Sequence, residues 1–538
     1  MVTPVGRQCK RKLSKFWAFF QRKHLVPAAS FLFLLLAILL LALLLLKEII
    51  VNLPDFKHET VCLSANQSFC IASEYHHLLA TGHPELVLIE PGLLVELQSF
   101  NWEHLRRRFD LPLEGFGHQD HWLTVGVFAS TSKDLLIEAL PSLGAFRVVE
   151  KVLGRLPNSA LASKNSNNSE QNRLPLHYFL QEDVSRKHSF GALYRLFGHR
   201  PLRLHIVVFH LVEEYLWVGA IPEEVQKEFS QQQQQQHKFS FHFGAYEQIF
   251  DPFAAETLYL HRPQQKQRHF PQQHQLEQHI SIIAVPDDIG HLLSQLPTSR
   301  YLHCPPERRE AWFKGANLTA NKGKEEVSLL AYRQMKALAR YLRMEVWIAC
   351  GTLLGWYRQC TVTPYTTDTD FASWAKYLRL AGREGGGQSA VSAESIDRLF
   401  QTALNNLQMG GDGKADGLKM YQRFGEPSSS LEYTFLVQGE QVDLFFTYAV
   451  HENGTKKLWI PAHVSGWYAH AVYPPFRLCS VALLGVKLLA PCDPEAVITA
   501  EYGATWRQPI SAYNYISSPQ NMLPFRKYNF NGPQRVVF

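Results

Sequence analysis

The stretch from Ala349 to Arg358, followed by an acidic pair, limits what this chain can fold into more than any other feature. An apolar strand pattern ends at the small-residue turn Gly351-Thr352, and Asp368 and Asp370 follow at positions i and i+2. Alternate residues of a strand point to the same face of a sheet, so these two carboxylates can bind one metal ion. A glycine turn also lets backbone N–H groups approach phosphate oxygens. The pattern is typical of enzymes that hold an activated phosphate.

A third acid extends this pattern. Asp443 lies between Val442 and the apolar run 444–446, where an unpaired buried charge would be costly. Three carboxylates suit Mg²⁺ or Mn²⁺, which prefer oxygen ligands and bridge to substrate phosphates. We expect the three acids to bind this metal, with Asp443 either assisting it or acting as general base. The expected ligands of the donor phosphates are Gly351, Thr352 and Arg358. For Arg358, a surface salt bridge is the alternative.

The segments around these acids predict an α/β core. Apolar residues recur with a helical period from Glu325 to Met344, and an apolar strand pattern follows over 346–349. Helix, strand, glycine turn and second helix form the front of a nucleotidyltransferase-type fold. We therefore expect a C-terminal catalytic domain over residues 320–538.

A separate α/β domain is expected over residues 85–300. Its apolar runs at 86–89, 123–128 and 204–209 are typical of buried strands, and helix-like segments separate them. Gln-rich stretches interrupt this domain and are expected to be solvated insertions. Because the region has no catalytic motif, we interpret it as a stem or interaction domain.

The N-terminal region predicts a membrane anchor. Residues 25–46 carry no charge, and a helix of this length reaches about 33 Å, enough to cross a bilayer. Apolar residues continue to Lys47 without a small-residue cleavage site, which favours an uncleaved signal-anchor over 25–47. Basic residues precede this span, so the positive-inside rule places the tail 1–24 in the cytosol. The stem 48–84 and both domains then lie on the luminal side.

The charge of the chain is concentrated in that tail. Its seven basic residues exceed the net charge of +6, so the rest of the chain carries −1. A luminal portion without excess positive charge argues against nucleic-acid binding.

Glycosylation sequons and cysteines are consistent with a luminal, oxidising location. The expected glycosylation sites are Asn66, Asn167, Asn317 and Asn453. Seven cysteines follow the anchor, so at least one is free or pairs between chains. Two apolar strands that fold back near Gly485 predict a disulfide between Cys479 and Cys492.

Several segments resemble the fukutin family. The run Gly351–Cys360 is very similar to the corresponding family segment, while 175–178 and 501–506 resemble the N-terminal and C-terminal regions of the family. The C-terminal part is also similar to the wider LicD phosphocholine-transferase family, which has a nucleotidyltransferase-like fold. Thr366 and Thr367 stand where many LicD relatives carry further acids.

This resemblance implies a Golgi single-pass type II membrane protein with a luminal catalytic domain. It would transfer ribitol 5-phosphate from CDP-ribitol to a phosphorylated O-mannosyl glycan of α-dystroglycan, in a complex with other glycan-assembly enzymes or alone. The metal-binding acids of the family fall on Asp368 and Asp370, and its later strand acid falls on Asp443.

Two other functions remain open. A nucleotide-sugar glycosyltransferase would share the type II anchor and the Asp-x-Asp motif, but its expected motif lacks the upstream Gly-Thr turn and the distant third acid. A non-catalytic scaffold of a glycan-assembly complex would explain an N-terminal domain without a visible site.

Overall fold

The computed structural model describes residues 60–62, 70–72, 87–89, 91, 94, 123–129, 146–157, 173–182, 203–231, 242–260, 281–378, 392–409, 417–452, 454–464, 467–510, 513–527 and 535–538. The expected anchor over 25–47 lies outside these residues and stays a prediction. Within the part that is described, no helix combines the length and the apolar character needed to cross a membrane.

The chain divides into two compact units. The smaller comprises Met1–Leu78 with Leu260–Ser281, and the larger comprises Leu79–Tyr259 with Ile282–Phe538. In the smaller unit, β1 (Thr60–Cys62) pairs antiparallel with β2 (Cys70–Ala72), and Cys62 is the register partner of Cys70. Apart from Leu260–Ser281, the larger unit holds both expected α/β regions. The proposed boundary between residues 300 and 320 stays a prediction.

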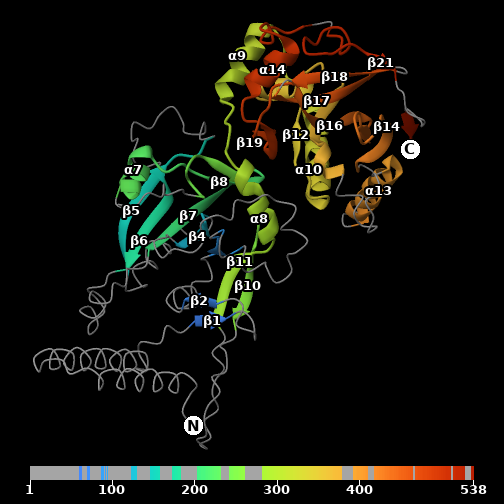
Figure 1. Cartoon of the computed structure of the whole chain (residues 1–538). Coiled ribbons are helices and arrows are strands. Elements are labelled where there is room, and N and C mark those ends of the chain that lie inside the picture. The colour runs from blue at the N-terminus through green and yellow to red at the C-terminus, as the bar shows by residue number, and fades with distance from the viewer. Residues whose placement is uncertain are drawn as a thin grey trace, which may run out of the picture. The chain divides into compact units, whose positions relative to one another are not determined.

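A mixed sheet occupies the N-terminal part of the larger unit (Figure 1, cyan to green). In this sheet, β7 (Arg203–Val212) runs parallel to β4 (Leu123–Phe128) and antiparallel to β6 (Leu174–Glu182) and β8 (Tyr215–Val218). The expected strands at 86–89, 123–128 and 204–209 are confirmed as β3, β4 and β7. The described strands are β3 (Val87–Leu88), β4 (Leu123–Phe128), β5 (Phe146–Gly154), β6 (Leu174–Glu182), β7 (Arg203–Val212), β8 (Tyr215–Val218), β9 (Gln248–Phe250), β10 (Ala255–Leu260) and β11 (Ser281–Pro286). The helices α7 (Glu223–Gln231), α8 (Ile289–Gln295) and η5 (Leu296–Thr298) accompany them.

A second mixed sheet forms the C-terminal part. Its main path runs β19-β20-β12-β13-β16-β15-β14-β22, and β17, β18 and β21 extend from β16. At its centre, β13 runs antiparallel to β12 and parallel to β16. The strands are β12 (Val346–Ile348), β13 (Asp368–Trp374), β14 (Lys419–Phe424), β15 (Glu432–Val437), β16 (Glu440–Glu452), β17 (Thr455–Val464), β18 (Trp467–Tyr473), β19 (Leu478–Leu483), β20 (Val486–Pro491), β21 (Arg526–Lys527) and β22 (Arg535–Val537).

Helices cover this sheet and close its core. Figure 1 shows α10 lying along the sheet, where it contacts β12, β15 and β16, while α11 packs against α9 and α14. The helices are α9 (Pro306–Ala316), α10 (Lys322–Tyr341), α11 (Cys350–Gln359), η6 (Ala375–Tyr377), α13 (Ala393–Met409) and α14 (Pro494–Tyr502). The mixed α/β architecture expected for the region is confirmed.

The long helix α10 shows why this sequence folds as it does. The Asn321 side chain accepts a hydrogen bond from the Lys324 backbone N–H at 3.1 Å and caps the first turn. One face of the helix buries Tyr332, Met335 and Leu338 in the core of the second sheet. Each such side chain contributes about 1.5–3 kcal/mol when fully removed from water. Packing therefore fixes the helix predicted over 325–344, which begins three residues earlier than expected.

Two disulfides reinforce this part of the chain. The predicted bond between Cys479 and Cys492 is confirmed, because β19 and β20 form the expected antiparallel hairpin around Gly485. A second bond, Cys304–Cys360, was not predicted and joins the segment before α9 to the end of α11. Among the described cysteines, Cys350 is free.

The segment after the first sheet is hydrogen-bonded to the second. Tyr301 and Ser480 form a parallel β-bridge, and the Ser480 N–H donates to the Arg300 carbonyl at 2.8 Å. The Ser480 hydroxyl also donates to the Thr298 carbonyl at 2.8 Å. These bonds hold α8 and η5 next to the hairpin that carries Lys487.

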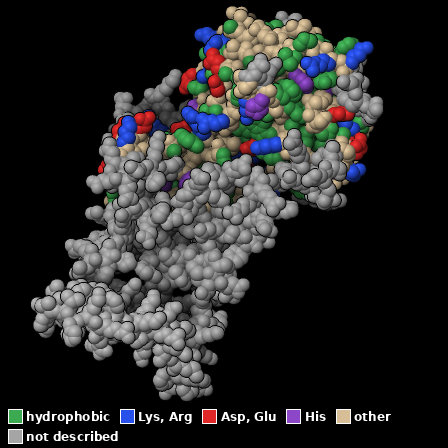
Figure 2. Space-filling model, in the orientation of Figure 1, with side chains coloured by type: hydrophobic (Ala, Val, Ile, Leu, Met, Phe, Trp, Pro, Cys, Tyr) green, Lys and Arg blue, Asp and Glu red, His purple; other side chains and the backbone are tan. Residues whose placement is uncertain are grey.

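On the face drawn in Figure 2, the coloured Lys and Arg side chains are interspersed with Asp and Glu side chains. They form no continuous basic stripe on that face of the described residues. Mixed charges of this kind are typical of an ordinary solvated surface.

Candidate active site

Three carboxylates meet on the neighbouring strands β13 and β16. The parallel register places Asp370 opposite Asp443, and Asp368 lies two residues earlier on β13. One carboxylate oxygen of each residue lies within 4.8 Å of the other two. Asp370 and Asp443 are only 7% and 5% exposed. This spacing suits a single divalent cation with oxygen ligands.

The first turn of α11 orients Asp370. The Gly351 N–H donates to Asp370 Oδ2 at 2.9 Å, and the Asp370 N–H donates to Thr352 Oγ1 at 2.8 Å. A Cβ atom at position 351 would lie 3.2 Å from Asp370 Oδ2, so glycine permits this close approach. Gly351 and Thr352 therefore hold the carboxylate in place. Their expected contact with donor phosphates stays a prediction.

Hydroxyl and amide groups orient the other two acids. Thr366 Oγ1 donates to Asp368 Oδ1 at 2.9 Å. Thr434 Oγ1 and Gln441 Nε2 donate to the two oxygens of Asp443 at 2.7 and 2.8 Å. Each carboxylate oxygen has further lone pairs, so a metal ion can still be bound. Sequence reasoning missed Thr434 and Gln441, because nothing distinguishes them from other polar residues of a strand.

The electrostatics of the cluster favour a bound cation. Burial raises the pKa of Asp370 well above its usual range, and the negative charges of Asp368 and Asp443 add to this effect. Burial likewise raises the pKa of Asp443 to about 6, against the hydrogen bonds from Thr434 and Gln441. A divalent cation would offset this concentration of buried negative charge. The donor set thus fits Mg²⁺ or Mn²⁺.

Two further charged residues adjoin the cluster and were not predicted. Lys324, at the start of α10, has a side chain only 8% exposed and forms an ion pair with Glu440. Its Nζ lies 3.5 Å from the backbone oxygen of Asp368. Glu501 on α14 is buried and accepts a hydrogen bond from the Tyr473 hydroxyl at 2.8 Å. The resemblance of 501–506 to the fukutin family was the sequence signal for Glu501, whereas Lys324 had none.

The Arg358 side chain contacts residues other than the three clustered acids. Its guanidinium donates to the Trp506 carbonyl and the Tyr365 hydroxyl, each at 3.4 Å. It also lies 4.9 Å from the centre of the Trp312 ring. With 5% exposure, the side chain is buried, so the alternative of a surface salt bridge is wrong. A role in binding donor phosphate stays a prediction.

One of the four expected glycosylation sites falls on described residues. Asn317 ends α9 in a left-handed conformation with φ of 52° and is exposed, so its side chain is accessible. Asn66, Asn167 and Asn453 lie outside the described residues.

The mixed sheet, the first turn of α11 and the three carboxylates are arranged as expected for a nucleotidyltransferase-type core. Residues 343–493 match the family described as "LicD/FKTN/FKRP, nucleotidyltransferase domain". The match covers β12, α11, β13 and β16, and therefore every residue of the carboxylate cluster.

The particular relatives are fukutins. The chain is 25% identical over 338 residues to "Ribitol-5-phosphate transferase FKTN" of Macaca fascicularis, and the match covers 60% of each chain. It is 27% identical over 251 residues to the protein of the same name in Mus musculus, covering 45% of this chain and 47% of the relative. An uncharacterized protein of Caenorhabditis elegans, W02B3.4, is 26% identical over 256 residues, covering 45% and 56%. The expected resemblance to fukutin is confirmed, and it extends over about three fifths of the first of these relatives.

Proposed function

We propose that this protein is a metal-dependent phosphotransferase that moves ribitol 5-phosphate from CDP-ribitol to a phosphorylated O-mannosyl glycan, such as that of α-dystroglycan. The observation that carries the proposal is the cluster of Asp368, Asp370 and Asp443 beside the first turn of α11. The name of the fukutin relatives supports the choice of ribitol 5-phosphate as the transferred group.

In the proposed reaction, an acceptor hydroxyl forms a bond to the phosphorus of the ribitol phosphate, and the bond from that phosphorus to CMP breaks. Asp368, Asp370 and Asp443 would hold Mg²⁺ or Mn²⁺. When bound, such an ion neutralises the donor diphosphate and the departing CMP.

The residues of the chain have distinct parts in this scheme. Asp443 is the candidate for accepting the proton of the attacking hydroxyl, because its carboxylate lies on β16 opposite Asp370 within the cluster. Gly351 and Thr352 keep Asp370 in its orientation. Lys324 forms an ion pair with Glu440 and donates to the Asp368 backbone oxygen, so its ammonium group is held beside the carboxylates.

The setting of the reaction is part of the same proposal. A signal-anchor over 25–47 would place the catalytic domain in the Golgi lumen, where a glycan acceptor is met and where the two disulfides can form. Association with other glycan-assembly enzymes fits this setting.

A donor panel tests the proposal. The purified protein is incubated with a phosphorylated O-mannosyl acceptor and CDP-ribitol, CDP-glycerol or UDP-sugars, in Mg²⁺, Mn²⁺ or EDTA, and nucleotide release is measured. We expect CMP release from CDP-ribitol that EDTA abolishes. Asp370→Asn removes a metal ligand and should abolish release. Asp493→Asn is the matched control, because Asp493 caps α14 and is not one of the three clustered acids, and Asn caps helices equally well.

Turnover of UDP-sugars alone would replace the proposal with a glycosyltransferase. Release that Asp370→Asn leaves unchanged would remove the carboxylate cluster from the mechanism. No turnover of any donor by a folded protein would favour a scaffold.

A further inference from the structure

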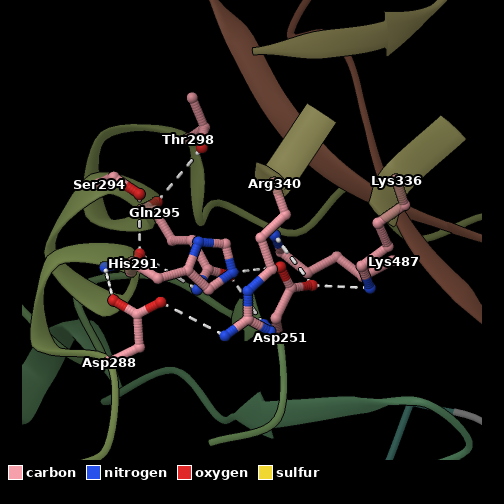
Figure 3. A network of polar contacts seen from close by, with 9 residues as sticks. All are labelled: Asp251, Asp288, His291, Ser294, Gln295, Thr298, Lys336, Arg340 and Lys487. Atoms are coloured by element: carbon pink, nitrogen blue, oxygen red, sulfur yellow. Dashed lines mark hydrogen bonds and ion pairs between the residues drawn. The ribbon is translucent and has the colours of Figure 1, made fainter. Parts of the chain in front are cut away.

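A second polar site lies near the other end of α10. A cavity of about 220 Å³ opens between α8 and the C-terminal half of α10, with β20 beside it (Figure 3). Apolar residues of β12, β13 and β20 form part of its wall. The charged residues that concern the argument are Asp251, His291, Lys336, Arg340, Arg343 and Lys487.

One buried carboxylate stands at the centre of this site. Asp251 Oδ1 lies 2.7 Å from Lys336 Nζ and 3.6 Å from Lys487 Nζ, while Asp251 Oδ2 lies 2.7 Å from His291 Nε2. Figure 3 shows the side chains of His291, Lys336 and Lys487, from α8, α10 and β20, converging on Asp251. A single negative charge is thus shared by two ammonium groups and an imidazole.

The other acidic residues that line the cavity do not balance this excess of positive charge. Asp288 is paired with Arg340 at 3.4 Å, and Glu345 lies 3.7 Å from Lys376, outside the cavity wall. Among the charged residues that line the cavity, four are Lys or Arg and three are Asp or Glu. The side chain of Lys487 is 6% exposed, and burial lowers its pKa. An ammonium group removed from water without a full partner is costly, and an anion in the cavity would offset that cost.

The cavity is separate from the carboxylate cluster. Lys324 adjoins the cluster and Lys336 lines the cavity, and both belong to α10. Twelve residues of helix separate them, which is about 18 Å at 1.5 Å per residue. The cavity also includes Phe371 of β13, the residue after Asp370, but neighbouring residues of a strand point to opposite faces of the sheet, and none of the three acids lines the cavity. A ligand in the cavity therefore does not take the place of a metal ligand.

We propose that this cavity is a binding site for a phosphate group, held by Lys336, Lys487 and Arg340. The two ammonium groups supply point charges, and the guanidinium supplies paired N–H donors that match phosphate oxygens. A single water occupies about 30 Å³ in the liquid, so the cavity also has room for groups attached to the phosphate. The site does not depend on the phosphotransferase function proposed above.

Calorimetric titration of the full chain with inorganic phosphate and, separately, with a hexose 6-phosphate tests this inference. EDTA is present throughout, so that no metal ion bridges phosphate to the carboxylate cluster. We expect saturable binding of at least one of the two. Tighter binding of the hexose 6-phosphate would identify a phosphorylated sugar as the ligand, and tighter binding of inorganic phosphate would identify the free anion.

The variants locate the binding. Lys336→Met should weaken it about tenfold or more, since one charge-assisted contact is lost. Arg333→Met is the matched control. Arg333 is a cation of the same helix, but it pairs with Glu214 and does not line the cavity. If Lys336→Met does not fold, Arg340→Met gives the same test with a half-exposed side chain.

Asp251→Asn distinguishes a ligand site from a closed structural network. It removes the internal competitor, so phosphate binding should tighten; a purely structural network would lose stability and gain no affinity. Asp370→Asn should bind phosphate like the unaltered protein. The inference is overturned if the unaltered protein binds neither ligand, if Lys336→Met binds equally well, if a folded Asp251→Asn gains no affinity, or if Asp370→Asn abolishes the binding.

Discussion

Replacing Asp443 by Asn should make the metal-free protein more stable at neutral pH. The carboxyl group is 5% exposed, and burial raises its pKa from the ordinary value of 3.8 to about 6. At neutral pH the folded protein must therefore keep a carboxylate ionised in an environment that disfavours the charge. Asn has nearly the same shape and carries no charge. Its oxygen can accept the Thr434 hydrogen bond, and its NH2 group can donate to the Gln441 amide oxygen once the exposed Gln441 amide rotates.

The size and the pH range of the effect follow from the two pKa values. Because the folded value is raised, the folded state binds the proton more tightly than the unfolded state does. The contribution of Asp443 to the free energy of unfolding is thus fully present below pH 3.8 and is lost as the pH rises through about 6. At about 1.4 kcal/mol for each pKa unit, the loss reaches about 3 kcal/mol above pH 7. Asp443→Asn removes that loss.

Urea unfolding in EDTA at pH values from 4.5 to 8 measures the effect. The variant should gain stability over the unaltered protein as the pH rises, up to about 3 kcal/mol. Asp493→Asn, at the exposed cap of α14, should show no such trend. Adding Mg²⁺ should stabilise the unaltered protein and not Asp443→Asn. A stability difference that does not vary with pH, or a variant less stable than its parent at pH 7.5 in EDTA, would refute the reasoning.

Three other predictions follow from the same structure. Mn²⁺ affinity, measured by calorimetry, should fall by at least about tenfold for each pH unit below 6, because Asp443 and Asp370, whose pKa values burial raises, must both lose their protons to bind the metal. Gly351→Ala should lower transfer activity, since its Cβ would lie 3.2 Å from Asp370 Oδ2, whereas Gly315→Ala meets nothing within 4 Å and should retain activity. Replacing both cysteines of a disulfide by Ala should lower the free energy of unfolding more for Cys304–Cys360 than for Cys479–Cys492. The first bond closes the longer loop, because its cysteines are 56 residues apart and those of the second are 13 apart. Loop-closure entropy gives about 4 and about 3 kcal/mol respectively, and equal losses in urea unfolding would contradict this explanation.

Local patterns in the sequence were sufficient to predict many of the strands and helices of the proposed catalytic region. The alternation of a strand places Asp368 and Asp370 on one face, and β13 begins at Asp368 as that pattern requires. The helical period of α10 and the hairpin that brings Cys479 to Cys492 were predicted for the same reason. In each case the residues involved are close in sequence, so backbone geometry alone relates them.

The assembly of the sites was decided by tertiary structure. Asp443 could be recognised as a buried acid, but only the parallel pairing of β13 with β16 sets it opposite Asp370. No periodicity relates Lys324 to Asp368, or Asp251 to Lys487, because these residues meet through elements far apart in the chain. The sequence by itself thus determined the fold class, the strand and helix faces and the acids available for a metal. Which faces became neighbours depended on long-range packing, which local spacing does not encode.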